Sequence, residues 1–237
     1  MLQGGFASVL RAGSRDDFRG EVVRFTRALG FKTMSAIAVV DGTLGRSEFV
    51  AVDNAPEGYS DAINDVQSMR RDPVMQHCRR HAFPIVWDQA TYTSQGLGEL
   101  WEEQARFGYR TGVCLAMHLP DGRHFVLGVD REEPLPTDVG ELTRMVADLQ
   151  LFAVYAQDVA LRVLSPSSQP EPLPTLTPRE LEALRWMMAG KTAWEMGAIL
   201  GISERTAVLH VNNAMHKLNC TSKHQAVLKA LRLGLIS

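Results

Sequence analysis

A proline-rich segment near the end of the chain constrains the fold most, because it divides the chain into two parts. Residues 165–174 have the sequence SPSSQPEPLP, which holds four of the 11 prolines and shows no hydrophobic periodicity. Such a segment is typical of an extended linker between domains. The length of 237 residues allows one large domain or two unequal ones. The sequence therefore predicts a domain over residues 1–164, a linker over 165–174 and a smaller domain over 175–237.

The two predicted domains differ in charge. The formal net charge of the whole chain is -2, which taken alone argues against a nucleic-acid partner. Residues 175–237 contain eight basic and four acidic side chains, a net charge of +4, whereas the residues before the linker contain 17 basic and 22 acidic ones, a net charge of -5. This asymmetry is expected when only one part of a chain meets a polyanion. The charge difference alone does not show that the C-terminal part binds nucleic acid, because two protein surfaces can differ in charge for other reasons. Sequence motifs are needed to distinguish these interpretations.

The apolar runs and the composition indicate a cytoplasmic protein. The chain is 45% hydrophobic and 22% charged, and its apolar runs, such as residues 151–156, are far shorter than the roughly 18–20 residues that span a bilayer. The first residues show no signal-peptide pattern, and we expect no membrane partner. Cys78, Cys114 and Cys220 lie too far apart for a zinc knuckle or a redox pair. We therefore expect buried free thiols and no disulfide, metal or cofactor.

The predicted C-terminal domain contains the start signals of three consecutive helices. Thr177-Pro-Arg-Glu180 and Thr192-Ala-Trp-Glu195 each have the spacing of a capping box. Gly201 is suited to end the second helix, and Ser203 is suited to cap a third helix over residues 204–218. A short helix, a glycine turn and a longer helix together predict a helix-turn-helix.

The third of these helices has two contrasting faces. The apolar face, at spacings of three and four, is expected in the core: Ala207, Val211, Ala214, Met215 and Leu218. The opposite face is rich in amides and nearly free of acids: Arg205, Thr206, Leu209, Asn212, Asn213 and His216, with Lys217 at its edge. Amides can form bidentate hydrogen bonds with adenine, and basic side chains and helix N-termini hold phosphates. A single polar face is more often a solvated surface, but the caps, the short preceding helix and the basic charge together favour DNA binding.

This region resembles the DNA-binding domain of LuxR-type transcription regulators. The residues that carry the resemblance are 176–184 (LTPRELEAL), 190–206, 210–213 and 217–218. The resemblance implies four helices, of which the one from Glu204 enters the major groove. The family usually has valine and then a polar residue at the positions of Ala207 and Val208, so a groove-facing Val208 is suited to touch thymine methyl groups instead. We predict Asn212 as the first base contact, within a DNA-binding set of Lys191, Thr192, Arg205, Thr206, Val208, Leu209, Asn212, Asn213 and Lys217.

The predicted N-terminal domain mixes strand and helix patterns. Strands are expected near residues 33–40, 48–52, 111–119 and 124–130, and helices over 16–29, 59–69, 73–80, 98–106 and 138–163. One sheet between helical layers is an α/β/α sandwich with room for a small ligand. The same type of DNA-binding domain also occurs on phosphorylated response regulators. The acidic pair, phosphoacceptor aspartate, threonine and lysine of a receiver domain do not emerge from this region.

The N-terminal region resembles the autoinducer-binding domain of LuxR-type receptors. The matching residues are Leu29-Gly-Phe31, Asp72-Pro73, Pro84-Ile-Val-Trp87, Trp101-Glu-Glu103, Gly108 and Gly112. The resemblance implies an N-acyl homoserine lactone between the sheet and one helical layer, with its amide N–H bound by Asp72 and its head group beside Trp87. The predicted ligand-binding set is Ser35, Tyr59, Asp72, Val74, Trp87, Trp101 and His124.

Each of these residues also has a simpler interpretation, and several family positions differ. Asp72 before Pro73 could cap the following helix, Trp87 and Trp101 could be core aromatics, and His124 could lie on the surface. Tyr59 stands where the family has a tryptophan that binds the lactone carbonyl, and its phenol can still donate. The usual tyrosines are replaced at two positions and the usual strand hydroxyl at one: Ala55, Ile63 and Gly128. We therefore predict a remodelled pocket that binds a lactone weakly or through other groups, such as Ser35 or His124, or that holds a different small molecule.

The last apolar helix pattern, over residues 138–163, either closes the sandwich or pairs with its twin in a second subunit, and both roles could apply. A two-fold dimer suits a helix-turn-helix, because paired half-sites double the number of bases read. The sequence thus predicts a homodimeric LuxR-type quorum-sensing regulator that binds inverted-repeat half-sites in double-stranded DNA under the control of an autoinducer. RNA polymerase is a further candidate partner.

Two alternatives stay open. The first is an orphan regulator whose altered pocket lets it bind DNA without ligand, or whose DNA binding is inhibited by ligand. The second, from another class, is a small-molecule enzyme or docking module fused to a DNA-binding domain. We rank the enzyme low, because the sequence shows no nucleophile with its base, no phosphate loop and no metal-ligand spacing.

Overall fold

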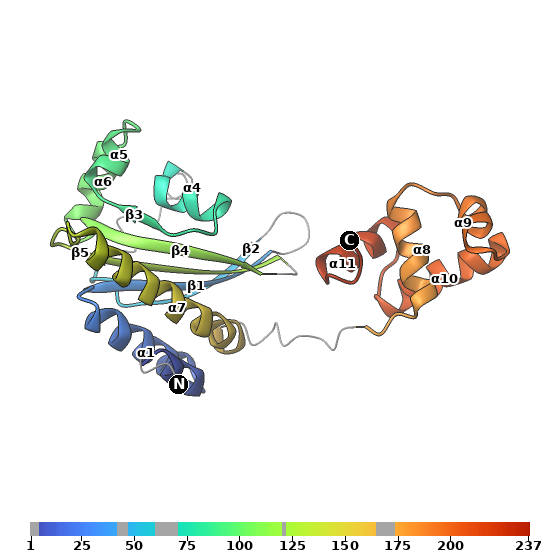
Figure 1. Cartoon of the computed structure of the whole chain (residues 1–237), viewed down its shortest axis with the longest axis horizontal. Helices are drawn as coiled ribbons and strands as arrows, with labels where there is room; N and C mark the ends of the chain where they lie inside the picture. Colours follow the sequence, from blue (N-terminus) through green and yellow to red (C-terminus); the bar gives the residue numbers. More distant parts are fainter. Residues whose placement is uncertain (1–4, 42–46, 60–70, 120–121, 165–173) are drawn as a thin grey trace. The chain divides into compact units, whose positions relative to one another are not determined.

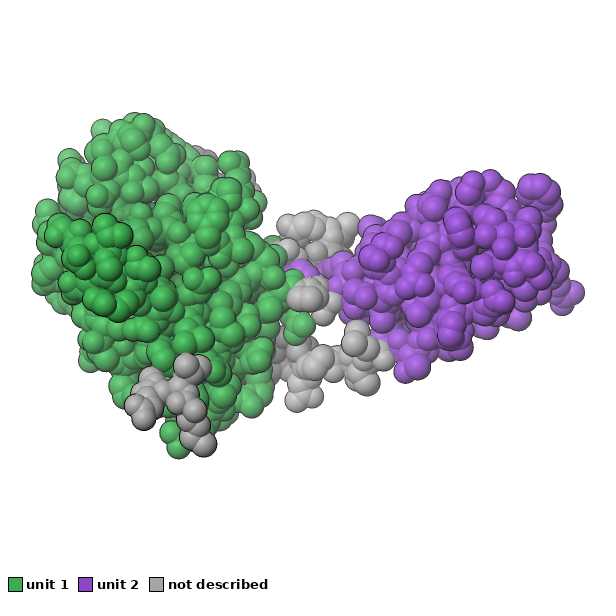
Figure 2. All heavy atoms as spheres, viewed as in Figure 1, with its two compact units in different colours: residues 1–119, 123–169 green, residues 120–122, 170–237 purple. Residues whose placement is uncertain are grey.

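The chain forms two compact units. The computed structural model describes five stretches of it: residues 5–41, 47–59, 71–119, 122–164 and 174–237. One unit contains residues 1–119 and 123–169, and the other contains residues 120–122 and 170–237; Figure 2 draws them in green and purple. The predicted domain boundaries stay predictions, because nearly all of the 165–174 segment lies outside the described residues.

The first unit is built on a five-stranded antiparallel sheet with the order β2-β1-β5-β4-β3 (Figure 1). The strands are β1 Thr33–Asp41, β2 Ser47–Asp53, β3 Ile85–Trp87, β4 Thr111–Leu119 and β5 Arg123–Arg131. The four predicted strands are confirmed. The sequence did not predict β3, because three residues are too few to show an alternation of polar and apolar side chains.

Helices cover both faces of this sheet, which confirms the α/β/α sandwich (Figure 1). One layer consists of α1 Arg15–Ala28 and α7 Val139–Leu164, with the 3-10 helix η1 Gly5–Arg11 packed against both. The other layer consists of α4 Pro73–Arg80, α5 Gln89–Thr93 and α6 Gly98–Ala105. The short η1 and α5 were not predicted, and nearly all of the helix expected over 59–69 lies outside the described residues.

The alternation along the strands separates two apolar clusters, one on each face. On β4, Val113 and Leu115 point into the larger cluster with Phe152 of α7, whose ring stacks on Phe25 with centroids 4.1 Å apart. The neighbouring Cys114 and Ala116 belong to the smaller cluster under α4, α5 and α6. Because α7 buries one side in the larger cluster, it closes the sandwich; its pairing with a second subunit stays a prediction.

The second unit consists of four helices, which confirms the predicted helical domain: α8 Pro178–Met188, α9 Ala193–Leu200, α10 Glu204–Lys217 and α11 Lys223–Arg232. Both predicted capping boxes form, at the starts of α8 and α9. Gly201 ends α9 in the left-handed conformation at φ 67°, and the Ser203 hydroxyl accepts a hydrogen bond from the backbone N–H of Thr206. No helix in the described stretches has both the length and the apolar character to cross a bilayer.

Gly197 and an ion pair fix α10 within this unit. A Cβ at Gly197 would lie only 2.9 Å from the carbonyl oxygen of Ile202, so glycine is required where α9 packs against the turn. Glu180, whose side chain is 4% exposed, accepts hydrogen bonds from the Thr177 backbone N–H at 2.7 Å and from Lys217 Nζ at 2.8 Å. Burial opposes the ionisation of Glu180, but these two donors hold its pKa below the usual value. The charged Glu180 therefore joins α8 to the end of α10.

Candidate ligand pocket and nucleic-acid interface

The sheet register brings one row of unlike residues together beneath α4, α5 and α6. Trp87 on β3 is the partner of Gly112 on β4, and Gly112 is the partner of Asp130 on β5. Antiparallel partners share a face of the sheet, so Trp87 and Asp130 flank the glycine. The next row on this face contains Cys114, Gly128 and Ser35.

These rows form the floor of a cavity of about 250 Å³. This volume lies just below the roughly 300–1,000 Å³ range of small-molecule pockets. Three carboxylates line it, from Asp53, Asp72 and Asp130, together with the phenols of Tyr59, Tyr92 and Tyr109 and the indole of Trp87. None of its described lining residues is a lysine, arginine or histidine. The described wall is thus aromatic and acidic.

Gly112 gives the floor its shape. A Cβ at this position would lie 2.4 Å from the carbonyl oxygen of Val129 and 2.7 Å from both Asp130 Oδ1 and Trp87 Nε1. No side chain fits there without moving the backbone of β5. The absence of a side chain lets the Trp87 indole and the Asp130 carboxylate approach one another across the row.

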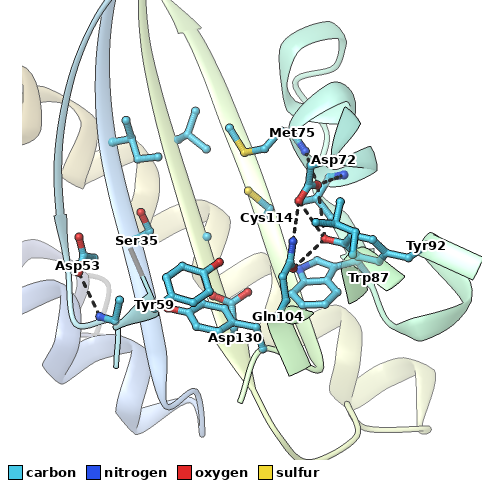
Figure 3. Close-up of a pocket in the computed structure, with 17 residues that line it drawn as sticks. Ser35, Asp53, Tyr59, Asp72, Met75, Trp87, Tyr92, Gln104, Cys114 and Asp130 are labelled. Carbon is cyan, nitrogen blue, oxygen red and sulfur yellow. Dashed lines mark hydrogen bonds between the residues drawn. The ribbon is translucent and has the colours of Figure 1, made fainter. Parts of the chain in front are cut away.

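Asp72 is held by donors from the protein itself (Figure 3). Its Oδ1 caps α4 by accepting the backbone N–H groups of Val74 at 2.8 Å and Met75 at 3.2 Å. Its Oδ2 accepts Gln104 Nε2 at 3.1 Å and the Tyr92 hydroxyl at 3.2 Å. The Tyr92 hydroxyl also lies 3.2 Å from Gln104 Oε1, so its single proton is shared, and the other three donors fill most of the roughly four acceptor positions of a carboxylate. The capping interpretation of Asp72 holds, and the residue also lines the cavity.

The tyrosines stay protonated and can act as donors. Tyr59 and Tyr109 stack with ring centroids 4.2 Å apart. Burial, followed by the negative charge of Asp130, raises the pKa of Tyr59 above its ordinary value, and burial followed by Asp72 does the same for the pKa of Tyr92. Their hydroxyl groups therefore remain neutral at physiological pH.

Asp130 is the exceptional group of the cavity. The residue is 8% exposed, and within the described stretches no donor forms a hydrogen bond with its carboxylate. Its backbone carbonyl, by contrast, accepts the Lys32 N–H at 3.0 Å and the Thr33 hydroxyl at 3.3 Å. Burial first, and the negative charge of Asp72 second, raise the pKa of Asp130 well above its usual range. Ionisation of Asp130 is therefore unfavourable inside this cavity.

Replacing Asp130 is therefore expected to stabilise the empty protein. Because the pKa of Asp130 is raised on folding, its ionisation lowers the free energy of unfolding as the pH rises from its unfolded value of about 3.9. The variant Asp130→Asn should have a melting temperature several degrees higher at pH 8, with a smaller gain at pH 5. The exposed Asp158→Asn on α7 is the matched control and should change little at either pH. A lower melting temperature for Asp130→Asn at both pH values would contradict the assignment.

The structure brings five of the seven predicted ligand-binding residues together around the cavity: Ser35, Tyr59, Asp72, Val74 and Trp87. It places the other two outside the described lining. Trp101 donates from Nε1 to the Arg110 carbonyl oxygen at 3.0 Å and packs in the smaller apolar cluster. His124 lies at the far end of β5, with its Nδ1 2.9 Å from His118 Nδ1.

Sequence reasoning missed several lining residues. Gln104 lies on α6, a predicted helix whose residue 104 was not selected, and Tyr92 lies on the short α5, which no periodicity revealed. Asp130 could have been predicted from the sequence, because it lies two residues after Gly128 and therefore on the same face of the strand. An acidic side chain on the buried face of a strand is unusual enough to mark a site.

The two faces of α10 are arranged as predicted. Ala207, Val211, Ala214 and Leu218 are buried, and Met215 is half-buried. The opposite face exposes Arg205, Leu209, Asn212, Asn213 and His216. Thr206 and Val208 are half-buried at its margin, and the Thr206 hydroxyl lies 2.8 Å from that of Ser203. An amide-rich surface on an exposed helix is suited to reading base edges.

Three other predicted DNA-binding residues already have partners within the unit. Lys191 pairs with Glu195 at 3.2 Å, Thr192 caps α9, and Lys217 pairs with Glu180. Lys191 also lines a surface hollow together with Lys223 and His224 at the start of α11. Neither residue was predicted to bind DNA, although α11 begins with these two basic side chains and carries Lys229 and Arg232 in its last turn.

Comparisons with known proteins support both units. The family described as autoinducer binding domain matches residues 14–160, and the family described as bacterial regulatory proteins, luxR family, matches residues 174–230. The quorum sensing-dependent transcriptional regulator RpaR of Rhodopseudomonas palustris is 32% identical over 213 residues, which cover 87% of this chain and 83% of RpaR. The transcriptional activator SolR of Ralstonia nicotianae is 31% identical over 216 residues, covering 91% and 90%.

Solved structures show the same fold. Escherichia coli SdiA has a TM-score of 0.71 at 24% identity and covers 97% of this chain and 94% of its own. Another SdiA structure contains octanoyl-rac-glycerol, with the same TM-score. CepR2 of Burkholderia cenocepacia has a TM-score of 0.56 at 22% identity, covering 70% of this chain and 94% of its own.

An α/β/α unit with a small-molecule pocket, joined in one chain to a helix-turn-helix unit, defines a transcription regulator rather than an enzyme. The chain belongs to the LuxR family of quorum-sensing transcription regulators.

Proposed function

We propose that this protein is a dimeric LuxR-type regulator whose pocket binds an N-acyl homoserine lactone or a related small molecule, and that occupancy of the pocket controls binding to an inverted-repeat operator. The observation that carries the proposal is the combination of a cavity lined by aromatic, aliphatic and acidic side chains with an exposed amide-rich face on α10. Ligand and operator binding would be linked through the populations of dimer and domain arrangements. The protein would act in the cytoplasm, with RNA polymerase as a further partner.

The lining supports a ligand that differs from an ordinary lactone in its polar contacts. Tyr59 and Trp87 offer N–H or O–H groups to a ligand carbonyl, whereas Gly128 offers no hydroxyl. Each missing hydrogen bond lowers affinity by roughly 0.5–1.5 kcal/mol. A thermal-shift screen of acyl-homoserine lactones of different chain length, beside a gel shift without ligand, tests this part. A stabilising shift supports the sensor, whereas tight DNA binding without any shift supports the orphan alternative.

Two features support a dimer: an exposed apolar side chain on α7, and the small number of bases that one helix-turn-helix can contact. Val154 is 45% exposed midway along α7, on the side away from the sheet. One helix-turn-helix contacts too few bases for useful specificity, so two copies are needed. Dilution in the analytical ultracentrifuge should separate the subunits and weaken operator binding over the same concentration range.

Two exposed arginines offer a matched test of the DNA-binding face. Arg205 lies on the amide-rich face of α10, and Arg185 lies on α8. Arg205→Ala should weaken binding to operator and to random DNA alike and reduce the salt dependence by about one counterion per subunit. Arg185→Ala removes the same charge and should leave both affinities within about twofold. Equal losses for the two variants would indicate a net-charge effect and contradict the placement of α10 on DNA.

A further inference from the structure

Of the three carboxylates that line the cavity, those of Asp53 and Asp72 accept hydrogen bonds from described residues and that of Asp130 accepts none. Asp72 accepts hydrogen bonds from two backbone N–H groups and from Gln104, and it shares the Tyr92 hydroxyl with Gln104 Oε1. Asp130 is 8% exposed, lines the same cavity and receives no hydrogen bond from the described residues. Figure 3 shows dashed lines at Asp72 and none at Asp130. The open acceptor of the pocket is therefore Asp130 rather than Asp72.

The surroundings of Asp130 favour a positively charged group. No basic side chain occurs among the described lining residues, while Asp53 and Asp72 add two more carboxylates. In Figure 3 the Asp130 carboxylate lies beside the ring of Tyr59, which stacks on Tyr109. Aromatic faces attract ammonium groups, and a buried carboxylate is stabilised most by a partner that carries the opposite charge.

The energetics point in the same direction. A buried ionised group without a partner is strongly unfavourable, and removing a polar group from water is tolerated when a ligand supplies the missing contact. Burial and the charge of Asp72 raise the pKa of Asp130, which disfavours its charged form in the empty cavity. An ammonium group at hydrogen-bond distance would reverse this preference, because it stabilises the carboxylate directly.

We propose that Asp130 anchors a protonated amine, so that the natural ligand of this pocket is an ammonium-bearing small molecule with a short apolar part. The apolar part lies along Ile37, Val74 and Val126, which line the same cavity. The proposal rests on the proposed function, in that it names the chemical class of the ligand for the same site. It sets this pocket apart from one that selects a neutral lactone.

Two probes that differ in one group test the proposal. N-hexanoylethylenediamine carries an amide and a terminal ammonium, and N-hexanoylethanolamine replaces the ammonium by a hydroxyl. Calorimetry on the full chain near neutral pH should show the ammonium probe binding about tenfold or more tightly, because hydrogen bonds to charged groups are roughly twice as strong as neutral ones. In Asp130→Asn this preference should fall to twofold or less, whereas Asp158→Asn on the exposed side of α7 should keep it.

The outcomes separate the two proposals. Two results would overturn the ammonium site. One is equal or tighter binding of the hydroxyl probe to the wild-type chain, which can be measured even if Asp130→Asn does not fold. The other is an unchanged preference for the ammonium probe in Asp130→Asn. N-hexanoyl homoserine lactone serves as the third ligand. If it binds and changes operator affinity while the ammonium probe does not bind, the ammonium site is wrong and the proposed function stands. If the ammonium probe binds as expected and neither it nor the lactone changes operator affinity, the ammonium site stands and the proposed function is wrong.

Discussion

The variant Asn212→Ala is expected to bind its operator far more weakly than the wild-type chain. Asn212 is exposed in the middle of the amide-rich face of α10, where its side chain can pair with a base edge. A bidentate base contact contributes about 1–3 kcal/mol, and two half-sites double it to about 2–6 kcal/mol, so the loss should be roughly 30-fold to 20,000-fold. Fluorescence anisotropy with an operator selected from random-sequence DNA measures this change.

Binding to random DNA provides the internal control for Asn212. An amide that reads bases contributes little to non-specific binding, which depends on phosphate contacts and salt. The affinity of Asn212→Ala for random DNA should therefore stay within about twofold of the wild-type value. A parallel loss on both DNAs would show that Asn212 contacts phosphate or supports the fold, and would contradict its role in reading sequence.

Replacing Gly112 by alanine is expected to destabilise the sensor unit severely. The added Cβ would lie 2.4 Å from the backbone carbonyl oxygen of Val129, which cannot move without opening the pairing of β4 with β5. Overpacking of this kind lowers the free energy of unfolding by about 3 kcal/mol or more. For a domain of this size that corresponds to a drop in melting temperature of roughly 6–12 °C, measurable by circular dichroism.

Gly128 is the matched control for this change. It lies on the same face of the sheet in the neighbouring row, but a Cβ there would meet only Cys114 Sγ at 3.7 Å, an ordinary contact distance. Gly128→Ala should therefore fold with a melting temperature within about 2 °C of the wild-type chain. If the two alanine variants were equally stable, the close approach of β5 to Gly112 would not be a feature of the folded protein.

The C-terminal unit could be predicted from the sequence because its signals are local. Capping boxes at Thr177 and Thr192 set the starts of α8 and α9, and the spacing of Ala207, Val211 and Ala214 identifies the buried side of α10. The partners of Lys217 were not predictable in this way. Its ion pair with Glu180 joins residues 37 positions apart, and no pattern within one helix reports such a contact.

The pocket could be predicted only in part, because its geometry depends on pairing between strands. The four longer strands appear in the sequence as apolar runs, whereas β3 and α5 are too short to show any pattern. The register that sets Trp87 and Asp130 on either side of Gly112 is a tertiary property. Asp72 illustrates the same limit, since the sequence left open whether it caps a helix or binds ligand, and the structure shows that it caps α4 and also lines the cavity.

The central proposal is that occupancy of the pocket changes the affinity of the dimer for its operator. The most direct measurement is the operator-binding curve of the wild-type chain, by anisotropy, without ligand and with a concentration of N-hexanoylethylenediamine that calorimetry shows to fill the pocket. Allosteric coupling is typically about 1–3 kcal/mol, so the midpoint should move by roughly fivefold or more, in either direction. The same midpoint with an empty and a filled pocket would contradict ligand control of DNA binding.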